Sequence, residues 1–484
     1  KRRNQKWITN PIKRQTKTFN KLLTSASSTT FGQDHGFSKI SSYEDFKKRV
    51  PVRDYEGLKP YVDKVVEGKK DILWPGQPLY FAKTSGTTSG AKYIPITKES
   101  IKTHINSARD ALLNYFLKTK NFKAINGKHM FLQGSPELEK KNGVYLGRLS
   151  GISAHYIPKL FLNNRKPSWS TNCIDDWEEK VDKIIEETVG EKMTIIAGIP
   201  SWVQMYFEKI VSNEKKTISK VFPDLSLYVY GGVSYEPYRS TFDKLLGKNI
   251  DTLATFPASE GFFGYQDDFS GNQTDLLLLL NNDIFYEFIE SKDFLKGDYD
   301  RISLKDVELN INYLLIISTS AGLWAYNIGD TIKFTSKEPY KIIVTGRIKH
   351  FLSAFGEHVI SEEVEKAMKI ATTKHNVTIR EFTVAPNINP KQGLPRHEWY
   401  VEFETIPDDI KRFSATLEKE MIGQNIYYKD LILGNIIQPL DIVNVNKGGF
   451  NNYMKSVGRL GGQNKVPRLS NDRKIADILN NFNF

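Results

Sequence analysis

Residues 84–92 read Thr-Ser-Gly-Thr-Thr-Ser-Gly-Ala-Lys, a run of hydroxyl side chains and glycines that ends in a lysine. Glycine lets backbone N–H groups approach an anion closely, hydroxyl groups donate further hydrogen bonds, and the lysine adds a positive charge. These properties suit a polyphosphate, although a surface turn would explain the stretch taken alone. The residues predicted to bind phosphate are Ser85, Gly86, Thr87, Thr88, Ser89 and Lys92.

The stretch differs from the P-loop of kinases and ATPases. That motif has four residues between its glycines and a Lys-Ser or Lys-Thr pair directly after the second glycine. Here three residues separate Gly86 from Gly90, and Tyr93 follows Lys92. The spacing therefore argues against a P-loop kinase or ATPase.

Other candidate residues follow predicted strands later in the chain. Gly232 belongs to a glycine pair after a predicted strand at 227–230, where a backbone could approach a ligand closely. Phe256, Ser259 and Glu260 follow a predicted strand at 251–255 and would supply a stacking surface, a hydrogen-bond donor and a metal ligand. Taken singly, Phe256 is better explained as a core residue and Glu260 as a solvated carboxylate.

Asp330 follows Gly329 in a predicted turn. A carboxylate held there could accept hydrogen bonds from two vicinal hydroxyl groups, as a ribose offers, although a plain Asx turn is the simpler explanation.

These residues need a sheet to position them, and the hydrophobic pattern predicts one. Segments rich in β-formers alternate with helical segments between residues 130 and 255, which is typical of a parallel sheet with crossover helices. A helix is predicted over 98–117, capped by Thr97, and a hairpin of two buried strands over 276–280 and 284–289. The fold class is therefore α/β, with a domain boundary expected at 346–349.

Composition narrows the function classes. The 484 residues are 39% hydrophobic, which suits two or three domains, and no apolar run reaches the ~20 residues of a membrane span. Cys173 is the single cysteine, so neither an intramolecular disulfide nor a Cys-rich zinc site is possible. We expect a cytoplasmic protein without a membrane partner.

The formal charge of +12 is spread along the chain without a nucleic-acid-binding motif. An anionic small molecule is therefore the better expected partner than a nucleic acid. The end of the chain, residues 458–468, is polar and glycine-rich and carries Arg459, Lys465 and Arg468. We expect a mobile arm that meets an anion, with a disordered basic tail as the alternative.

Taken in order, five motifs resemble those of adenylate-forming enzymes, and more closely those of the GH3 family of acyl-acid amido synthetases. The motifs are the Ser-Gly-Thr-Thr-x-Gly loop at 85–90, Phe256 to Glu260 in place of Tyr-x-x-Ser-Glu, the Tyr-x-x-Gly-Asp turn at 326–330, Gly346-Arg347, and the ending at 463–468. That ending, Gln-Asn-Lys-Val-Pro-Arg, has its Gln and Asn swapped relative to the family pattern. The resemblance runs from about Phe31 to Arg468.

The resemblance implies a large N-terminal adenylation domain built on crossover-connected sheets, residues 1–346, and a smaller, mobile α+β C-terminal domain, residues 347–484. It also implies roles for single residues. Ser85 to Ser89 would hold the phosphates of ATP, Phe256 would face the adenine, and Asp330 would hold the ribose.

Four further roles follow from the same resemblance. Ser259 would lie near the phosphates or the acyl carboxylate, and Glu260 would bind Mg²⁺. Arg347 would sit at the domain junction, and Lys465 would be the catalytic lysine, delivered for adenylation when the C-terminal domain swings.

The implied activity is ATP-dependent adenylation of a carboxylic acid, followed by transfer of the acyl group to an amine, an amino acid in this family, to form an amide. Two alternatives stay open. One is an acyl-CoA ligase or another adenylate-forming enzyme, which shares the first half-reaction. The other is a nucleotide-binding protein without turnover.

Overall fold

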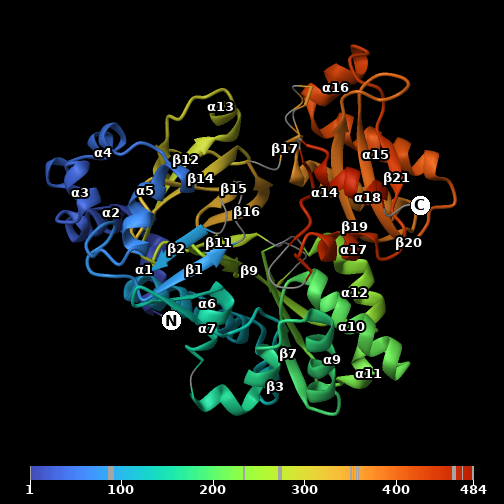
Figure 1. Ribbon diagram of the computed structural model, residues 1–484, viewed down its shortest axis with the longest axis horizontal. Helices are drawn as coiled ribbons and strands as arrows, with labels where there is room; N and C mark the ends of the chain where they lie inside the picture. Colours follow the sequence, from blue (N-terminus) through green and yellow to red (C-terminus); the bar gives the residue numbers. More distant parts are fainter. Residues whose placement is uncertain are drawn as a thin grey trace. The chain divides into compact units, whose positions relative to one another are not determined.

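The computed structural model describes residues 2–84, 92–157, 159–232, 235–270, 275–348, 351–352, 354–355, 357, 359–460, 465–470 and 472–481 (Figure 1). Contacts divide the chain into two units. The first comprises Lys1–Ile199, Phe222–Gly232 and Ile250–Val344, and the second comprises Pro200–Val221, Val233–Asn249 and Thr345–Phe484. The second unit therefore includes two segments that lie, in sequence, between strands of the first.

One mixed sheet runs through the first unit. Within the described residues its twelve strands follow the order β13-β12-β14-β15-β16-β11-β10-β9-β8-β7-β3-β6. Their bounds are β3 Lys128–Phe131, β6 Arg165–Lys166, β7 Met193–Ala197, β8 Leu227–Gly231, β9 Asp251–Ala258, β10 Gly261–Gln266, β11 Leu276–Leu278, β12 Ile284–Glu290, β13 Ile302–Ser303, β14 Asn312–Thr319, β15 Tyr326–Lys337 and β16 Tyr340–Arg347.

The predicted parallel part of the sheet is confirmed. Strands β6, β3, β7, β8 and β9 pair in parallel with one another, in that order. Four of the five residues of β7 are buried, as expected for a parallel strand whose two faces are both covered. The remaining pairings recorded for the sheet, from β9 to β13, are antiparallel.

The predicted hairpin over 276–289 is wrong. Both segments are strands, but β11 pairs with β10 and β16, whereas β12 pairs with β13 and β14. Leu276, Leu277 and Leu278 are all buried, so no polar face restricts the choice of neighbour. The sheet as a whole, and not the short connection at 281–283, therefore determines the pairing.

A second sheet of the first unit carries the ends of the glycine-rich stretch. Its order is β2-β1-β5-β4, and β1 is antiparallel to β2 but parallel to β5. The strands are β1 Tyr80–Thr84, β2 Lys92–Ile96, β4 Glu139–Lys141 and β5 Val144–Gly147. The stretch therefore joins two antiparallel neighbours, and it does not lead from a strand into a crossover helix.

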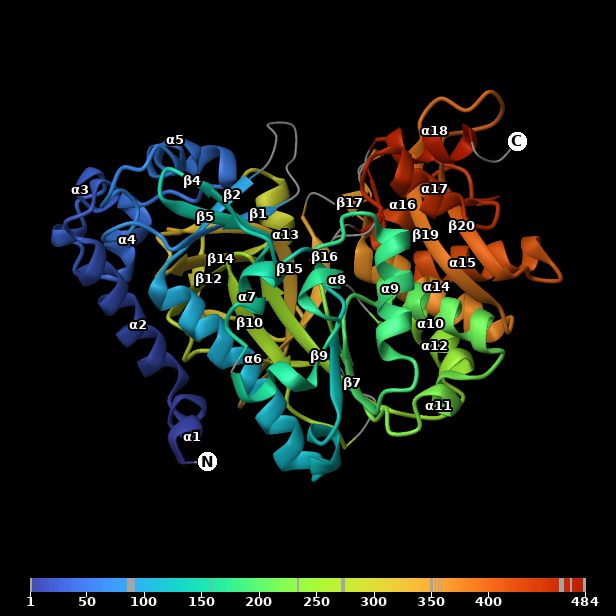
Figure 2. The same cartoon turned by 60° about the horizontal axis from the view of Figure 1, so that its bottom comes forward.

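The helices of the first unit include α6, which begins at the predicted cap. Thr97 Oγ1 accepts a hydrogen bond from Ser100 N at 3.1 Å, and α6 packs against β9 and β10 (Figure 2). The helices are α1 Arg2–Thr9, α2 Pro11–Ala26, α3 Thr30–Asp34, α4 Tyr43–Arg49, α5 Tyr55–Val66, α6 Lys98–Thr119, α7 Leu149–Ala154, α8 Trp169–Asn172, α9 Trp177–Thr188 and α13 Ser291–Leu295, with short 3-10 turns η1 Phe37–Lys39, η2 Phe122–Ile125, η3 Lys159–Asn164 and η5 Leu304–Asp306.

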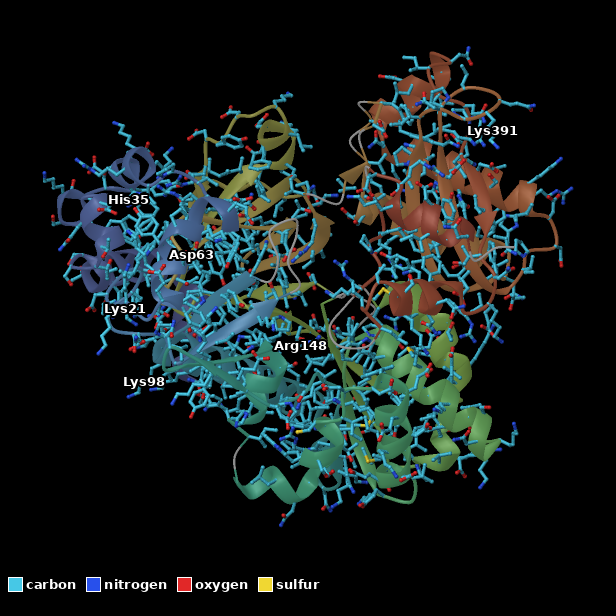
Figure 3. The ribbon with its side chains drawn as sticks, viewed as in Figure 1. Lys21, His35, Asp63, Lys98, Arg148 and Lys391 are labelled. Atoms are coloured by element: carbon cyan, nitrogen blue, oxygen red, sulfur yellow. The ribbon has the colours of Figure 1, made fainter. Side chains whose placement is uncertain are left out.

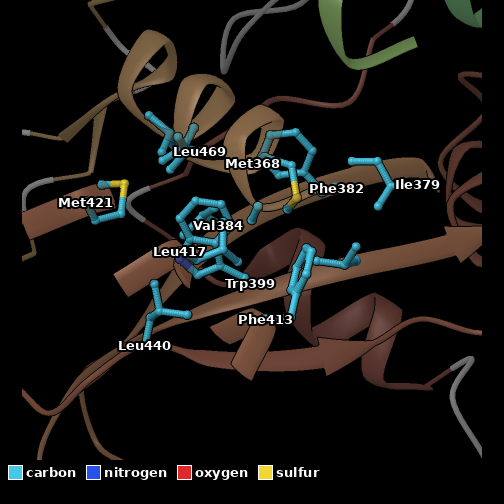
Figure 4. Packing of buried hydrophobic residues seen from close by; sticks show 14 of the residues in the cluster. Met368, Ile379, Phe382, Val384, Trp399, Phe413, Leu417, Met421, Leu440 and Leu469 are labelled. Atoms are coloured by element: carbon cyan, nitrogen blue, oxygen red, sulfur yellow. The ribbon is translucent and has the colours of Figure 1, made fainter. Parts of the chain in front are cut away.

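The second unit packs helices around the sheet β19-β20-β21. Trp399 of β20 and Phe382 of β19 stack with ring centroids 5.9 Å apart, inside a cluster that also contains Leu417 and Leu469 (Figure 4). The strands are β17 Phe351–Leu352, β18 Val359–Ile360, β19 Thr378–Asn387, β20 Arg396–Thr405 and β21 Asp441–Asn444. The helices are α10 Pro200–Glu214, α11 Ile218–Val221, η4 Glu236–Tyr238, α12 Arg239–Leu246, α14 Ser361–Lys374, α15 Ile410–Gln424, α16 Ile426–Leu433, α17 Gly449–Ser456 and α18 Lys474–Asn481.

Exposed lysines occur on elements far apart in the sequence. Lys21 on α2, Lys98 at the start of α6 and Lys391 between β19 and β20 are all exposed (Figure 3). No helix in the described part of the chain is both long enough and apolar enough to cross a membrane.

Candidate functional site

Ser259 and Glu260 form the tight turn between β9 and β10. Ala258 pairs with Gly261, so these two residues alone connect the antiparallel strands. Both are half-buried. The strand pairing on both sides fixes the position of the turn, and it places a hydroxyl and a carboxylate at the carboxyl end of β9.

Gly231 and Gly232 lie at the same edge, because β8 runs parallel to β9. Gly231 pairs with Thr255, and a Cβ atom at Gly231 would lie 2.7 Å from the Thr255 carbonyl oxygen. The strands approach too closely for any other side chain. Gly232 follows with a φ of 83°, a backbone conformation that favours glycine. The predicted glycine pair is thus adjacent to the strand that leads to Glu260.

Asp330 lies in an irregular part of β15. Leu314 pairs with Thr331 and Ile316 with Asn327, so three residues of β15 face Leu315 alone. Gly329 has a φ of 84°, and its N–H donates to Asn327 Oδ1 at 2.7 Å. The predicted turn is therefore a bulge closed by an Asx-type hydrogen bond, and Asp330 is buried in it.

Contacts of residues 53–55 connect Lys92 with β15, the strand that carries Asp330. Its ammonium lies 5.4 Å from the centre of the Tyr55 ring, and the Tyr55 hydroxyl accepts a hydrogen bond from Tyr93 N at 2.9 Å. Two residues earlier, Arg53 N donates to Ala325 O, and Arg53 O accepts from Asn327 N at 2.8 Å. Lys92 is thereby tied to the start of β15, four residues before Asp330.

A second series of contacts connects the turn that carries Glu260 with β15. A Cβ atom on Gly261 would lie 2.6 Å from Ile284 Cδ1 at the start of β12. Ile284 pairs with Thr319 of β14, and Ile317 pairs with Tyr326 of β15. Both series of contacts lead to the start of β15 within the first unit, and Gly232 directly follows β8, the neighbour of β9. That Lys92, Glu260 and Asp330 form one site stays a prediction.

Phe256 and His104 pack against aromatic rings of β10, near the turn that carries Glu260. Phe256 is 6% exposed and packs edge-on against Phe263 at 5.0 Å, so its predicted role beside adenine stays a prediction. His104 of α6 packs edge-on against Phe262 at 5.4 Å, close to the turn that carries Glu260. Burial lowers the pKa of His104 to about 4, which keeps the imidazole neutral.

Sequence reasoning missed His104 and Tyr55. His104 lies on the predicted helix over 98–117, but helical spacing does not show which strand the helix covers. Tyr55 ends a stretch with Pro51 that reads as a connection. Burial raises the pKa of Tyr55, so its hydroxyl stays protonated at neutral pH. Its place beside Lys92 follows only from the fold.

For the other predicted residues the structure gives less information. Ser85, Gly86, Thr87, Thr88 and Ser89 lie outside the described residues. Arg347 ends β16 and belongs to the second unit, as does Lys465, which is exposed. Their roles stay predictions.

The prediction of a mobile basic arm is wrong for Arg468. Its side chain is 8% exposed and forms ion pairs with Glu365 and Glu381 inside the second unit. An arginine that is already paired in this way is not available to a substrate anion. Lys465, three residues earlier, is exposed and keeps its predicted role as a hypothesis.

Glu260 suits a magnesium ion that takes most of its ligands from the substrate and from water. No group of three or more His, Cys, Asp and Glu side chains in the described ranges could hold a metal. Mg²⁺ bound through one or two carboxylates, with the remaining positions filled by substrate phosphates and water, needs no such group. A single half-buried carboxylate on a fixed turn is compatible with that mode of binding.

Comparison with family models gives three consecutive matches to one family. The GH3 family N-terminal domain matches residues 1–167, the central domain 277–347 and the C-terminal domain 362–474. A jasmonoyl–L-amino acid synthetase of Nicotiana attenuata is 21% identical, over 94% of this chain and 90% of that protein. The indole-3-acetic acid-amido synthetase GH3.15 of Arabidopsis thaliana is 22% identical, over 90% of this chain and 87% of that protein.

Solved structures share the fold. The GH3.15 acyl acid amido synthetase superposes with a TM-score of 0.79 at 17% identity, covering 98% of this chain and 94% of that chain. A 2-hydroxyisobutyryl-CoA ligase in its postadenylation state gives a TM-score of 0.60 at 12% identity, over 96% of this chain and 90% of that chain. The fold is that of the adenylate-forming enzymes, and the chain belongs to the GH3 family.

Proposed function

We propose that this chain is an ATP-dependent ligase that joins a carboxylic acid to the amino group of an amino acid. The acid would first react with ATP, forming an acyl adenylate and releasing pyrophosphate. The amine would then displace AMP and form the amide. The observation that carries the proposal is membership of the GH3 family, because relatives that match nearly the whole chain are named as a jasmonoyl–L-amino acid synthetase and an indole-3-acetic acid-amido synthetase.

The phosphates of ATP would lie beside Lys92 and residues 85–89. Both reactants of the first step are anions, so the site must offset their repulsion. Hydroxyl groups and backbone N–H groups from the glycine-rich stretch would donate to the phosphate oxygens, and Lys92 would add a positive charge that Tyr55 holds in place. Ser259, on the turn after β9, would lie near the phosphates or the acyl carboxylate.

Glu260 would hold Mg²⁺, whose charge shields the phosphates when it is bound. The carboxylate is suited to this role because the two-residue turn between paired strands leaves it little freedom to move. Asp330 would accept hydrogen bonds from the ribose hydroxyls, and the bulge around Gly329 would let the sugar approach the backbone. Phe256 would face the adenine, and Gly232 would allow the close approach of the nucleotide.

Lys465 would neutralise charge on the α-phosphate in the transition state of adenylation. The proposed division of labour places the nucleotide in residues 1–346 and this lysine in residues 347–484. Motion about the junction near Arg347 would bring the lysine in for adenylation and remove it for acyl transfer. Water must be excluded throughout, because it would hydrolyse the acyl adenylate.

An acyl-CoA ligase is the second candidate. The fold shared with 2-hydroxyisobutyryl-CoA ligase favours it specifically, because a thiol acceptor would use the same first half-reaction. The two functions differ only in the acceptor, so the products distinguish them. A cytoplasmic location, and the lack of nucleic-acid and membrane partners, stay predictions from the sequence.

The test is acid-dependent exchange of pyrophosphate into ATP, followed by acceptor competition. The purified protein is incubated with ATP, Mg²⁺ and a panel of carboxylic acids, and each acid that stimulates exchange is then offered amino acids or coenzyme A. We expect exchange with at least one acid and an amide identified by mass. A thioester alone would favour the second candidate, and no exchange across the panel would contradict both.

A further inference from the structure

Arg468, near the end of the second unit, bonds four partners with its guanidinium. Its Nε donates to Glu365 Oε1 at 3.2 Å, one terminal nitrogen bonds Glu381 and the Phe382 carbonyl, and the other donates to the Tyr238 hydroxyl at 3.2 Å. Burial alone would lower its pKa, but Glu381, Tyr238 and Glu365 outweigh that effect and raise it. The guanidinium is therefore charged at every working pH.

The segment around Arg468 is fastened to the edge of β19. Val384 N donates to Arg468 O at 2.9 Å, Ser470 N donates to Val384 O at 3.0 Å, and Thr383 Oγ1 donates to Pro467 O at 2.7 Å. Leu469 forms a parallel bridge with Val384 and is fully buried in the cluster of Figure 4. Residues 467–470 therefore continue the sheet by one short stretch.

Lys465 lies two residues before the segment that is attached to β19. It is exposed, and it lines a cavity of about 80 Å³ together with Arg468, Glu381 and Tyr238. An extended chain spans at most about 3.5 Å per residue, so the Cα atom of Lys465 lies within about 10 Å of that of Arg468.

We propose that Arg468 is the positioning residue for Lys465, because its buried guanidinium fixes the register of residues 467–470 on β19, which begin two residues after Lys465. The inference rests on the proposed function, in which Lys465 acts in adenylation. Leu469 anchors the segment on β19 through apolar contacts. If the segment shifted by one residue along β19, other apolar contacts could replace these. A slip of the buried guanidinium would leave Glu365 and Glu381 without their partner, and register is the best-attested use of buried ion pairs.

The experiment compares Arg468→Lys with the unmodified protein in the two half-reactions. Lysine keeps the charge but cannot reach Glu365, Glu381, Tyr238 and the Phe382 carbonyl together. We expect kcat for acid-dependent pyrophosphate exchange to fall by about 10- to 100-fold, with KM for ATP nearly unchanged, because small misplacements of a catalytic group cost that much. Amide formation from supplied acyl adenylate should stay near its original rate.

Three further comparisons separate positioning from general stability. Arg301→Lys alters an equally buried arginine, paired with Glu287 in the first unit, and should leave exchange unaltered. In a Lys465→Ala background, Arg468→Lys should reduce exchange by less than about twofold more, since a residue that acts through Lys465 loses its effect once Lys465 is gone. Glu365→Gln, a milder change, should give an intermediate loss of exchange.

A readout independent of activity completes the test. Hydrogen exchange of the peptides that contain Val384 and Ser470 should become faster in Arg468→Lys, while the melting temperature stays close to that of Arg301→Lys. Unchanged protection of those peptides, full exchange activity in Arg468→Lys, equal loss of both half-reactions, or an undiminished effect in the Lys465→Ala background would each overturn the proposal. No acid-dependent exchange by the unmodified protein would instead refute the proposed function, and the positioning role with it.

Discussion

The two units hold their candidate residues in different ways. Glu260 lies on a two-residue turn between paired strands, and Asp330 lies inside β15, which pairs with β14 on one side. Lys465 lies in the described residues outside every helix and strand, three positions before the buried Arg468. The strand pairings next to Glu260 and Asp330 hold these residues from both sides, whereas the attachment to β19 begins at Pro467, two residues after Lys465.

The difference indicates a division between a fixed site and an adjustable group. Residues that hold a nucleotide gain from a rigid sheet, because the donors are then already placed when the ligand arrives. A lysine needed for only one of two half-reactions gains from a segment with a single firm attachment. The predictions below test the two sides of this comparison.

The largest effect is expected at the adjustable group. Lys465→Ala should lower acid-dependent pyrophosphate exchange by about 10²–10³-fold, by analogy with other preorganised transition-state donors. Nucleotide binding, measured by calorimetry, should change little. Lys474→Ala serves as the control, because Lys474 is an exposed lysine of the same unit. Full exchange activity in Lys465→Ala would remove the lysine from its role.

The fixed side should show a dependence of stability on pH. His104 has a pKa of about 4 in the folded chain against 6.5 when unfolded, so below pH 6.5 the unfolded state takes up the proton first. Its contribution is complete above pH 6.5 and is lost as the pH falls towards 4, a loss of roughly 2–3 kcal/mol.

Urea unfolding at pH 7 and pH 4.5 measures this loss. His104→Gln should be less sensitive to the drop in pH than the unmodified protein, because the titrating group is absent. Equal sensitivity of the two proteins would show that His104 is not held neutral by the fold.

Glu260→Gln tests the metal on the fixed side. Glutamine keeps the size of the side chain but removes the charge that Mg²⁺ prefers, so the Mg²⁺ concentration needed for half-maximal exchange should rise by about tenfold or more. Glu186→Gln, an exposed carboxylate on α9, should leave that concentration unaltered. The same metal dependence in both variants would make Glu260 a structural residue.

The smallest expected effect concerns the close approach of β8 and β9. Gly231→Ala would place a methyl group 2.7 Å from the Thr255 carbonyl oxygen, so the strands must separate, at a cost of about 1–3 kcal/mol of unfolding free energy. Gly423→Ala in α15 meets no atom within 4 Å and should be neutral or slightly stabilising. If both variants unfold at the same urea concentration as the unmodified protein, the sheet is less rigid than we infer.

Local features of the fold could be predicted from the sequence. The cap at Thr97 depends on residues close together in the chain, and the parallel strands from β3 to β9 follow from the regular alternation of strand and helix segments. The partners of β11 and β12 could not be predicted, because strands buried on both faces carry no pattern that distinguishes one apolar neighbour from another.

Prediction from the sequence has the same limit for the candidate site. Motif order identified Lys92, Glu260 and Asp330 as candidates, and their convergence on one ligand stays a prediction. The burial of Arg468 could not be foreseen, because its partner Tyr238 lies 230 positions away and Glu365 lies 103 positions away. A polar, glycine-rich composition alone suggests a mobile arm, and only the tertiary structure reveals the buried carboxylates that hold this one.

The most direct test of the account is the stoichiometry of a single reaction. The protein is supplied with ATP, Mg²⁺, an acid that stimulates exchange, and a mixture of amino acids, and all products are measured together. We predict that AMP, pyrophosphate and an amide appear in equal amounts. Release of ADP and phosphate, or formation of AMP without any amide, would contradict the proposal that this member of the GH3 family makes amides through an acyl adenylate.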